Sequence, residues 1–143
     1  MAFDPFDPPR WLRWVAVALA AGAIFHASVL ASPTADGPAF GPLGVLGLDK
    51  WLHAVAYAGL ASAFAVALVP DFEVSVAAGL AVLFAVGYGV GIEFVQLSAP
   101  ERAFSVTDMA ANGTGALVGT AAWRLAAAFT ERLRSTSRSK LRT

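Results

Sequence analysis

The sequence of 143 residues contains no cysteine, and charged residues make up only 14% of it. The missing cysteine excludes a disulfide framework, a thiolate metal site and a cysteine nucleophile. Soluble globular chains are about 25% charged, well above the value for this chain. The chain is also 57% hydrophobic, which is more apolar surface than a soluble domain of its size can hide from water. The ten cationic residues balance the ten acidic ones, which argues against nucleic acid as a partner because nucleic-acid binders carry a basic excess.

The sequence contains four long runs without a charged residue. They lie between Arg13 and Asp36, Lys50 and Asp71, Glu73 and Glu93, and Asp108 and Arg124, and hold 22, 20, 19 and 15 residues. A helix needs about 20 mostly apolar residues to cross a hydrocarbon core of about 30 Å. The fourth run reaches that length if Arg124 snorkels toward the headgroups. We therefore predict an all-α membrane protein, a bundle of four transmembrane helices at about 12–31, 50–69, 75–97 and 107–129.

The remaining segments are predicted to be tails and loops. Residues 1–11 form a turn-rich lead, 12–131 one membrane domain, and 132–143 a basic, serine-rich tail that we expect to fray. Glycine and proline between residues 32 and 48 indicate an irregular loop. Residues 29–31 resemble a signal-peptide cleavage site, but the apolar run before them is longer than such peptides carry, so we expect this helix to be retained.

Lysine and arginine are distributed unevenly along the chain. Eight of the ten fall on the side of the two termini, and only Lys50 and Arg102 fall on the other side. Cytoplasmic loops carry the excess of lysine and arginine. We therefore expect both termini in the cytoplasm, the loops 32–49 and 98–107 outside, and a multi-pass protein of the cell membrane with the lipid bilayer as its main partner.

Three groups of polar residues interrupt the apolar helices at helical spacing, and charges near a bilayer are functional candidates because they are costly there. They are Asp49, Lys50, His53 and Tyr57 in the second helix; Gly89, Glu93 and Gln96 in the third; and Arg102, Asp108, Asn112, Gly115 and Gly119 in or just before the fourth. The second and fourth helices enter at the outer face and the third leaves there. At 1.5 Å per residue, His53, Glu93 and Asp108 should all lie within roughly 10 Å of the outer boundary.

Each group also has a structural interpretation. His53 and Tyr57 are equally typical of an interfacial hydrogen-bonding pair. Glu93 can pair with Lys50 or Arg102 and lock the bundle, although a buried ion pair contributes little net stability.

The fourth helix has structural interpretations of its own. Asp108 can be the N-terminal anchor of this helix. Gly115 and Gly119 form a small-xxx-small pair that is typical of helix packing, Gly89 suits the same role in the third helix, and such faces leave a homodimer open. Only His53 joins the polar groups and no His-x-x-x-His pair occurs, so we predict no metal and no cofactor.

The same residues, taken in order, resemble the VanZ-like family of small integral membrane proteins. The matching elements are Asp49-Lys50-x-x-His53-x-x-x-Tyr57-x-x-Leu60, Glu93-x-x-Gln96, Arg102 and Asp108-x-x-x-Asn112-x-x-Gly115-x-x-x-Gly119. They span about half of the chain, and the departure from the family pattern is Pro100 and Glu101 before Arg102, where a glycine is common. The resemblance implies an integral membrane protein with a relation to resistance against the glycopeptide teicoplanin, and it implies no defined reaction.

Three functional hypotheses follow from these residues. In the first, a polar site at the outer end of helices two to four binds or acts on an anionic lipid-linked or cell-envelope molecule, whose phosphate or carboxylate meets Lys50 and Arg102. The candidate catalytic residues are Glu93, His53 and Asp108, and the candidate ligand-binding residues are Asp49, Lys50, Tyr57, Gln96, Arg102 and Asn112.

In the second hypothesis, the polar residues only lock the helices of a structural or accessory membrane protein. In the third, Glu93 is the proton relay of a small transporter. The third has least support, because residues 61–69 and 77–86 contain Ser62 as their one polar residue.

Overall fold

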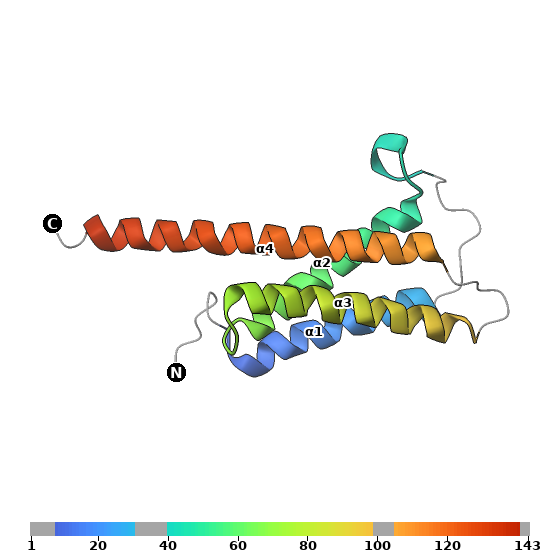
Figure 1. Ribbon diagram of the computed structural model, residues 1–143, viewed down its shortest axis with the longest axis horizontal. Helices are drawn as coiled ribbons and strands as arrows, with labels where there is room; N and C mark the ends of the chain where they lie inside the picture. The colour runs from blue at the N-terminus through green and yellow to red at the C-terminus, as the bar shows by residue number, and fades with distance from the viewer. Residues whose placement is uncertain (1–7, 31–39, 99–104, 141–143) are drawn as a thin grey trace.

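The computed structural model describes residues 8–30, 40–98 and 105–140, and all the regular elements in these ranges are helices (Figure 1). The four α-helices are α1 Arg10–Phe25, α2 Leu48–Leu68, α3 Val74–Gln96 and α4 Val106–Lys140. A π-helical turn, η1 His26–Leu30, continues α1, and a short 3-10 turn, η2 Pro42–Gly44, precedes α2. The predicted all-helical architecture is confirmed.

Local chemistry sets most of the helix boundaries. The carbonyl of Pro9 accepts the first backbone bond of α1, from the N–H of Leu12 at 2.9 Å. Helix α2 ends at Leu68, two residues before Pro70, because a proline has no backbone N–H to continue the helical hydrogen bonds. At the start of α4, the hydroxyl of Ser105 accepts the N–H of Asp108 at 3.2 Å, which is the bond of an N-cap serine.

The C-terminal part of α4 corrects one expectation. We expected the basic segment after residue 131 to fray, but α4 continues as a helix of 35 residues up to Lys140. No glycine or proline follows Gly119, so the segment contains neither of the two residues that most readily end a helix. At 1.5 Å per residue α4 is about 52 Å long, and its last turns extend well past the other helices (Figure 1).

Within the described ranges, three stretches are long and apolar enough to cross a membrane: Arg10–Leu30, Leu48–Leu68 and Val74–Gln96. Large apolar side chains on these stretches face outward, as those of Leu19, Val55 and Leu83 do, each more than 60% exposed. Such a surface suits contact with lipid tails and not with water. Three of the four predicted membrane spans therefore have the required length and composition, and a crossing by α4 stays a prediction.

The helices alternate in direction through the bundle (Figure 1). Helices α1 and α3 run one way, whereas α2 and α4 run the other way and lie side by side. Arg10 and the C-terminal turns of α4 are consequently at the same end. We call the other end, where α2 and α4 begin and α3 ends, the polar end.

Small residues bring α2 and α4 into close contact. A Cβ atom on Gly115 would lie 2.1 Å from the carbonyl oxygen of Ala54, and one on Gly119 would lie 2.2 Å from that of Ala58. Such approach is possible only without a side chain, so the two helices meet through their backbones. The hydroxyl of Ser62 adds a hydrogen bond to the carbonyl of Gly119 at 3.1 Å. This contact fixes the register that brings the beginnings of α2 and α4 together.

Candidate functional site

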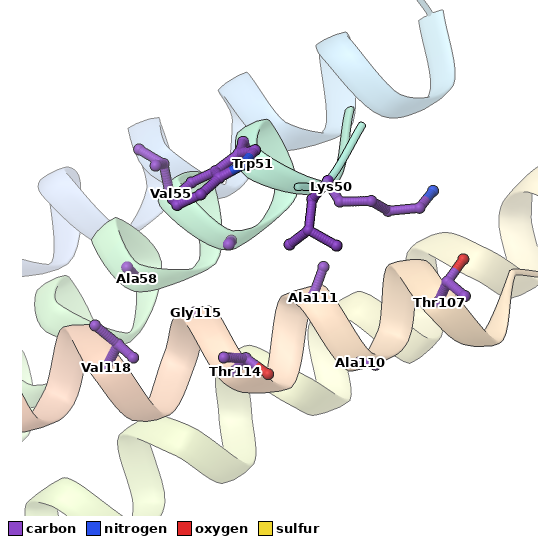
Figure 2. Close-up of a pocket in the computed structure, with 12 residues that line it drawn as sticks. Lys50, Trp51, Val55, Ala58, Thr107, Ala110, Ala111, Thr114, Gly115 and Val118 are labelled. Carbon is purple, nitrogen blue, oxygen red and sulfur yellow. The ribbon is translucent and has the colours of Figure 1, made fainter. Parts of the chain in front are cut away.

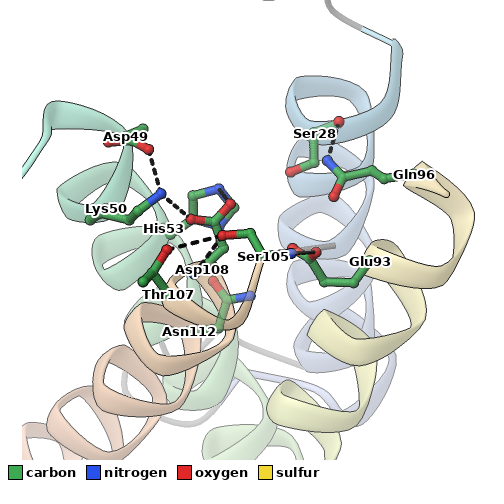
Figure 3. Close-up of polar contacts among 10 residues, drawn as sticks. All are labelled: Ser28, Asp49, Lys50, His53, Glu93, Gln96, Ser105, Thr107, Asp108 and Asn112. Carbon is green, nitrogen blue, oxygen red and sulfur yellow. Dashed lines mark hydrogen bonds and ion pairs between the residues drawn. The ribbon is translucent and has the colours of Figure 1, made fainter. Parts of the chain in front are cut away.

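Lys50 lies between two carboxylates at the polar end. Its Nζ is 2.6 Å from Oδ2 of Asp49 and forms a second ion pair with Oδ1 of Asp108 (Figure 3). The side chains of Lys50 and Asp108 are 23% and 19% exposed, so this pair is largely shielded from solvent. This shielding strengthens the attraction relative to water, and the pair joins the first turn of α2 to the first turn of α4.

His53 lies one turn below this ion pair and contacts α4. Its Nδ1 is 2.9 Å from Oδ1 of Asn112, and its Nε2 is 3.9 Å from Oδ2 of Asp108. With Nδ1–H donating to the amide oxygen, Nε2 is the free nitrogen of a neutral ring and faces a carboxylate. This arrangement fixes the orientation of the imidazole between Asn112 and Asp108.

Tyr57 lies one turn deeper, stacked on His53 with ring centroids 6.4 Å apart and planes 13° apart. The residue is 1% exposed, and its hydroxyl has no hydrogen-bond partner among the described residues. Gly89 of α3 faces its ring, since a Cβ there would lie 3.0 Å from Cε1 of Tyr57 and 3.0 Å from Nδ2 of Asn112. Gly89 therefore leaves the space that Tyr57 and Asn112 occupy.

Glu93 ties α3 to the start of α4. It is 1% exposed, and its Oε2 accepts the backbone N–H of Ser105 at 2.9 Å (Figure 3). The ion pair considered between Glu93 and Lys50 is not formed, because Lys50 pairs with the two aspartates instead. Ser105 was missed as a site residue, although Ser105-x-x-Asp108 is the serine–acid spacing of a helix N-terminus.

Gln96 ties α3 to the end of η1. Its Nε2 donates to the carbonyl oxygen of Ser28 at 2.7 Å. Carbonyl groups in the last turn of a helix lack a partner within the helix, and the amide satisfies one of them. Ser28 could not be predicted from the sequence, because a backbone acceptor leaves no trace in residue identity.

Residues from all of these helices enclose a cavity of about 430 Å³, which we call the polar cavity. Its lining residues are Ala23, Ile24, Ala27, Ser28, Asp49, Leu52, His53, Ala56, Tyr57, Gln96 and Asp108. In Figure 3, the side chains of α2 and α4 gather on one side and Gln96 with Ser28 lies on the other. The structure thus brings most of the predicted polar residues to one end of the bundle and gives them a common space.

A second cavity of about 570 Å³, the apolar groove, lies between α2 and α4 (Figure 2). Its lining residues are Leu46, Lys50, Trp51, Ala54, Val55, Ala58, Thr107, Ala110, Ala111, Thr114, Gly115 and Val118. Apart from Lys50 and two threonines, this wall is apolar or aromatic. Lys50 lines the groove and Asp108 lines the polar cavity, so their ion pair separates the two spaces.

The predicted ligand-binding residue Arg102, with Pro100 and Glu101, lies outside the described residues. Within the described part of the chain, no three His, Cys, Asp or Glu side chains are grouped so that they could hold a metal ion.

Comparison with protein families gives one match, to the model described as VanZ/LLP1, over residues 13–127. The chain belongs to the VanZ/LLP1 family. Neither the curated proteins nor the solved structures contain a match to it. The matched region runs from the first turn of α1 into α4, so every residue of the polar end lies inside it. The predicted VanZ-like family is confirmed, and this VanZ/LLP1 protein is an integral membrane protein.

Proposed function

We propose that this VanZ/LLP1 protein holds the polar head of an anionic lipid-linked or cell-envelope molecule in the polar cavity. The observation that carries the proposal is the cavity itself, a space of about 430 Å³ where polar side chains converge among apolar ones, in a bundle whose other buried residues are mostly alanine and leucine. Ligand sites are typically concave and mostly apolar, with a few convergent polar groups. The ligand would meet Asp49, His53 and Gln96 there, with Asn112 holding the imidazole in place.

The apolar groove supports a ligand that carries a hydrocarbon part. It lies directly beside Lys50, so a molecule whose anionic group pairs with Lys50 has an apolar surface next to that group. A fully polar ligand would not cover this apolar surface, whereas an acyl or polyprenyl chain would cover it, and burial of apolar area stabilises the complex. Arg102 would add a second cation for the same anionic group.

We also propose that α4 is a fourth membrane span. It follows α2 along its length, from the ion pair of Lys50 with Asp108 to Trp123, which packs against the buried group that contains Leu68. A helix in contact with a spanning helix over this length crosses the same layer. The mean hydropathy of α4 is reduced chiefly by the charged residues and serines of its last turns, and in its first half Gly115 and Gly119 face α2 and not lipid.

In the cell membrane, the orientation that we propose places the polar end outside. The basis is the excess of lysine and arginine at the opposite end, to which the C-terminal turns of α4 belong. The site then faces the compartment in which cell-envelope molecules are assembled and glycopeptides act. A contribution to teicoplanin resistance is the corresponding cellular role.

If the site performs a reaction, His53 is the general base that its hydrogen bonds favour. Its Nε2 lines up with Asp108, which would stabilise the imidazolium formed on proton uptake. Glu93 is a weaker candidate, because its carboxylate is 1% exposed and already accepts the N–H of Ser105. It therefore holds α3 against α4.

The structural alternative is favoured by one specific observation, the mutual pairing of the polar side chains. Lys50 with Asp108, Glu93 with Ser105, and Gln96 with Ser28 each connect two helices. A purely structural role predicts that these contacts stabilise the bundle and that no ligand binds. No observation favours the proton relay, because Thr120 is the one buried polar residue described between Asn112 and the opposite end.

Native mass spectrometry of the full chain, purified in mild detergent, separates these functions. We expect a lipid or envelope precursor to co-purify with the wild type and to be lost from Lys50→Gln, which removes the cation that pairs with its anionic group. The matched control is Asp71→Asn, which removes the exposed ion pair with Arg10 at the opposite end and should keep the ligand. A folded wild-type protein that carries and takes up no such molecule would refute the proposal and favour the structural alternative.

A further inference from the structure

The wall of the polar cavity is acidic. Asp49 and Asp108 both line it, whereas Lys50, which pairs with both, lines the apolar groove instead. Buried Glu93 adds a third carboxylate at the polar end. Among the described residues of this end, Lys50 is the one lysine or arginine, and it pairs with Asp49 and Asp108 but not with Glu93. The side chain of Asp49 is 61% exposed, whereas Asp108 and Glu93 are shielded from solvent, and shielded carboxylates favour an occupant that brings positive charge.

The polar atoms around the cavity are mostly hydrogen-bond acceptors. Ionised carboxylates accept only, and Asp49 and Asp108 provide two of them. Gln96 donates one N–H to the carbonyl of Ser28, which leaves its amide oxygen as an acceptor beside one remaining N–H. His53 directs Nδ1 to Asn112, which leaves Nε2 as an acceptor. An occupant matched to this wall must therefore donate several hydrogen bonds, and a primary ammonium group has three N–H donors.

Tyr57 provides a second and independent observation. It lines the cavity, is 1% exposed, and its hydroxyl has no partner among the described residues. Buried polar groups almost always have a partner. Side chains of a helix tilt toward its N-terminus, which directs the ring of Tyr57 toward the polar end, where it stacks on His53. The unpartnered hydroxyl is thus a group that a bound ligand would satisfy.

From these observations we propose that the polar cavity binds a primary ammonium group carried by the head of a membrane phospholipid. The inference rests on the proposed function, because it names the head that the cavity takes. The ammonium lies between the carboxylates and the hydroxyl of Tyr57. The phosphate of the same head pairs with Lys50, and one chain follows the apolar groove. Such a head carries both an anionic and a cationic group, so it suits the lysine and the acidic wall together.

The test uses the full chain in detergent and three phospholipids with identical chains. Phosphatidylethanolamine has a primary ammonium, phosphatidylcholine has the same charges without N–H donors, and phosphatidylglycerol is anionic with hydroxyl groups. Glycerophosphoethanolamine presents the same ammonium without chains. Binding is measured by native mass spectrometry and by the shift in unfolding temperature. The variants are Tyr57→Phe and Asp108→Asn, with Asp71→Asn as the control far from the cavity.

We expect phosphatidylethanolamine to bind at least tenfold more tightly than phosphatidylcholine. Tyr57→Phe should keep the unfolding temperature of the ligand-free protein, because the lost hydroxyl had no partner, yet weaken phosphatidylethanolamine binding about tenfold, or about 1.4 kcal/mol. Asp108→Asn should weaken it at least as much, and Asp71→Asn should leave it unchanged. Binding of the lipid alone supports a membrane source of the ammonium, and equal binding of glycerophosphoethanolamine supports the ammonium with a soluble source.

Three other outcomes overturn the inference. Equal binding of phosphatidylethanolamine and phosphatidylcholine removes the role of the N–H donors. Tighter binding of phosphatidylglycerol overturns the proposed binding of an ammonium group but leaves the proposed anionic ligand in place. Binding of none of these molecules overturns the inference, whereas the proposed function falls only if the purified wild type also carries no lipid or envelope precursor.

Discussion

The contact between α2 and α4 predicts opposite effects for two neighbouring glycines of one helix. A Cβ on Gly115 would lie 2.1 Å from the carbonyl oxygen of Ala54 and 2.7 Å from its Cα, whereas one on Gly113 would meet nothing within 4 Å. Gly115→Ala and Gly113→Ala add the same methyl group to the same helix. Only the first forces a clash, and the atoms that it meets are backbone and cannot rotate away.

The magnitude follows from this distance. Ordinary contacts begin at 3.4 Å, so the new methyl on Gly115 is about 1.3 Å too close and the helices must move apart. Overpacking of this kind costs about 1–3 kcal/mol. Separation also stretches the 2.9 Å hydrogen bond between His53 and Asn112, worth about 1 kcal/mol. We expect Gly115→Ala to lower the free energy of unfolding by about 2–4 kcal/mol, and Gly113→Ala to raise it by about 0.5–1 kcal/mol through helix propensity.

Unfolding in mixed micelles of mild detergent and increasing dodecyl sulfate, followed by circular dichroism, measures both variants against the wild type. Gly119→Ala serves as a replicate, since its Cβ would lie 2.2 Å from the carbonyl of Ala58. If Gly115→Ala and Gly113→Ala have free energies of unfolding within about 0.5 kcal/mol of each other, the close packing of α2 on α4 is wrong.

Three smaller perturbations can be measured by the same unfolding assay. Ser105→Ala removes the N-cap of α4 and should cost about 0.5–2 kcal/mol; an unchanged free energy would show that the cap is not formed. Tyr88→Phe removes the 2.7 Å hydrogen bond to the carbonyl of Ala21 and should cost about 1 kcal/mol, so a neutral result would contradict the contact between α3 and α1. Asp71→Asn breaks an exposed ion pair with Arg10 and should cost under about 1 kcal/mol, less at high salt; a larger, salt-independent loss would contradict its exposed position.

Periodicity predicted the part of the site that lies on regular helices. Asp49, His53 and Tyr57 recur every four residues, so any helix places them on one face. The series from Asp108 to Gly119 does the same on α4. The structure places the two stripes against each other, with Lys50 on Asp108 and His53 on Asn112. The one-letter pattern carried this information because helical geometry converts spacing into direction.

Other contacts had no such pattern. The bonds from Gln96 to Ser28 and from Ser105 to Glu93 use backbone groups, which every residue possesses. The choice of the aspartates over Glu93 as the partners of Lys50 depends on which carboxylate the helix register brings within reach. The residue types alone are compatible with each of these pairings, so they could not predict which ones form.

The sequence by itself determined that this chain belongs in a bilayer, that it is helical, and which side chains share a helix face. These properties depend on composition and on spacing along a single helix. Only the tertiary structure decided which faces meet, that the polar side chains enclose a cavity, and that the hydroxyl of Tyr57 is left without a partner in its wall. Those outcomes depend on the distance and register between helices, which the glycines of α4 set by letting two backbones touch.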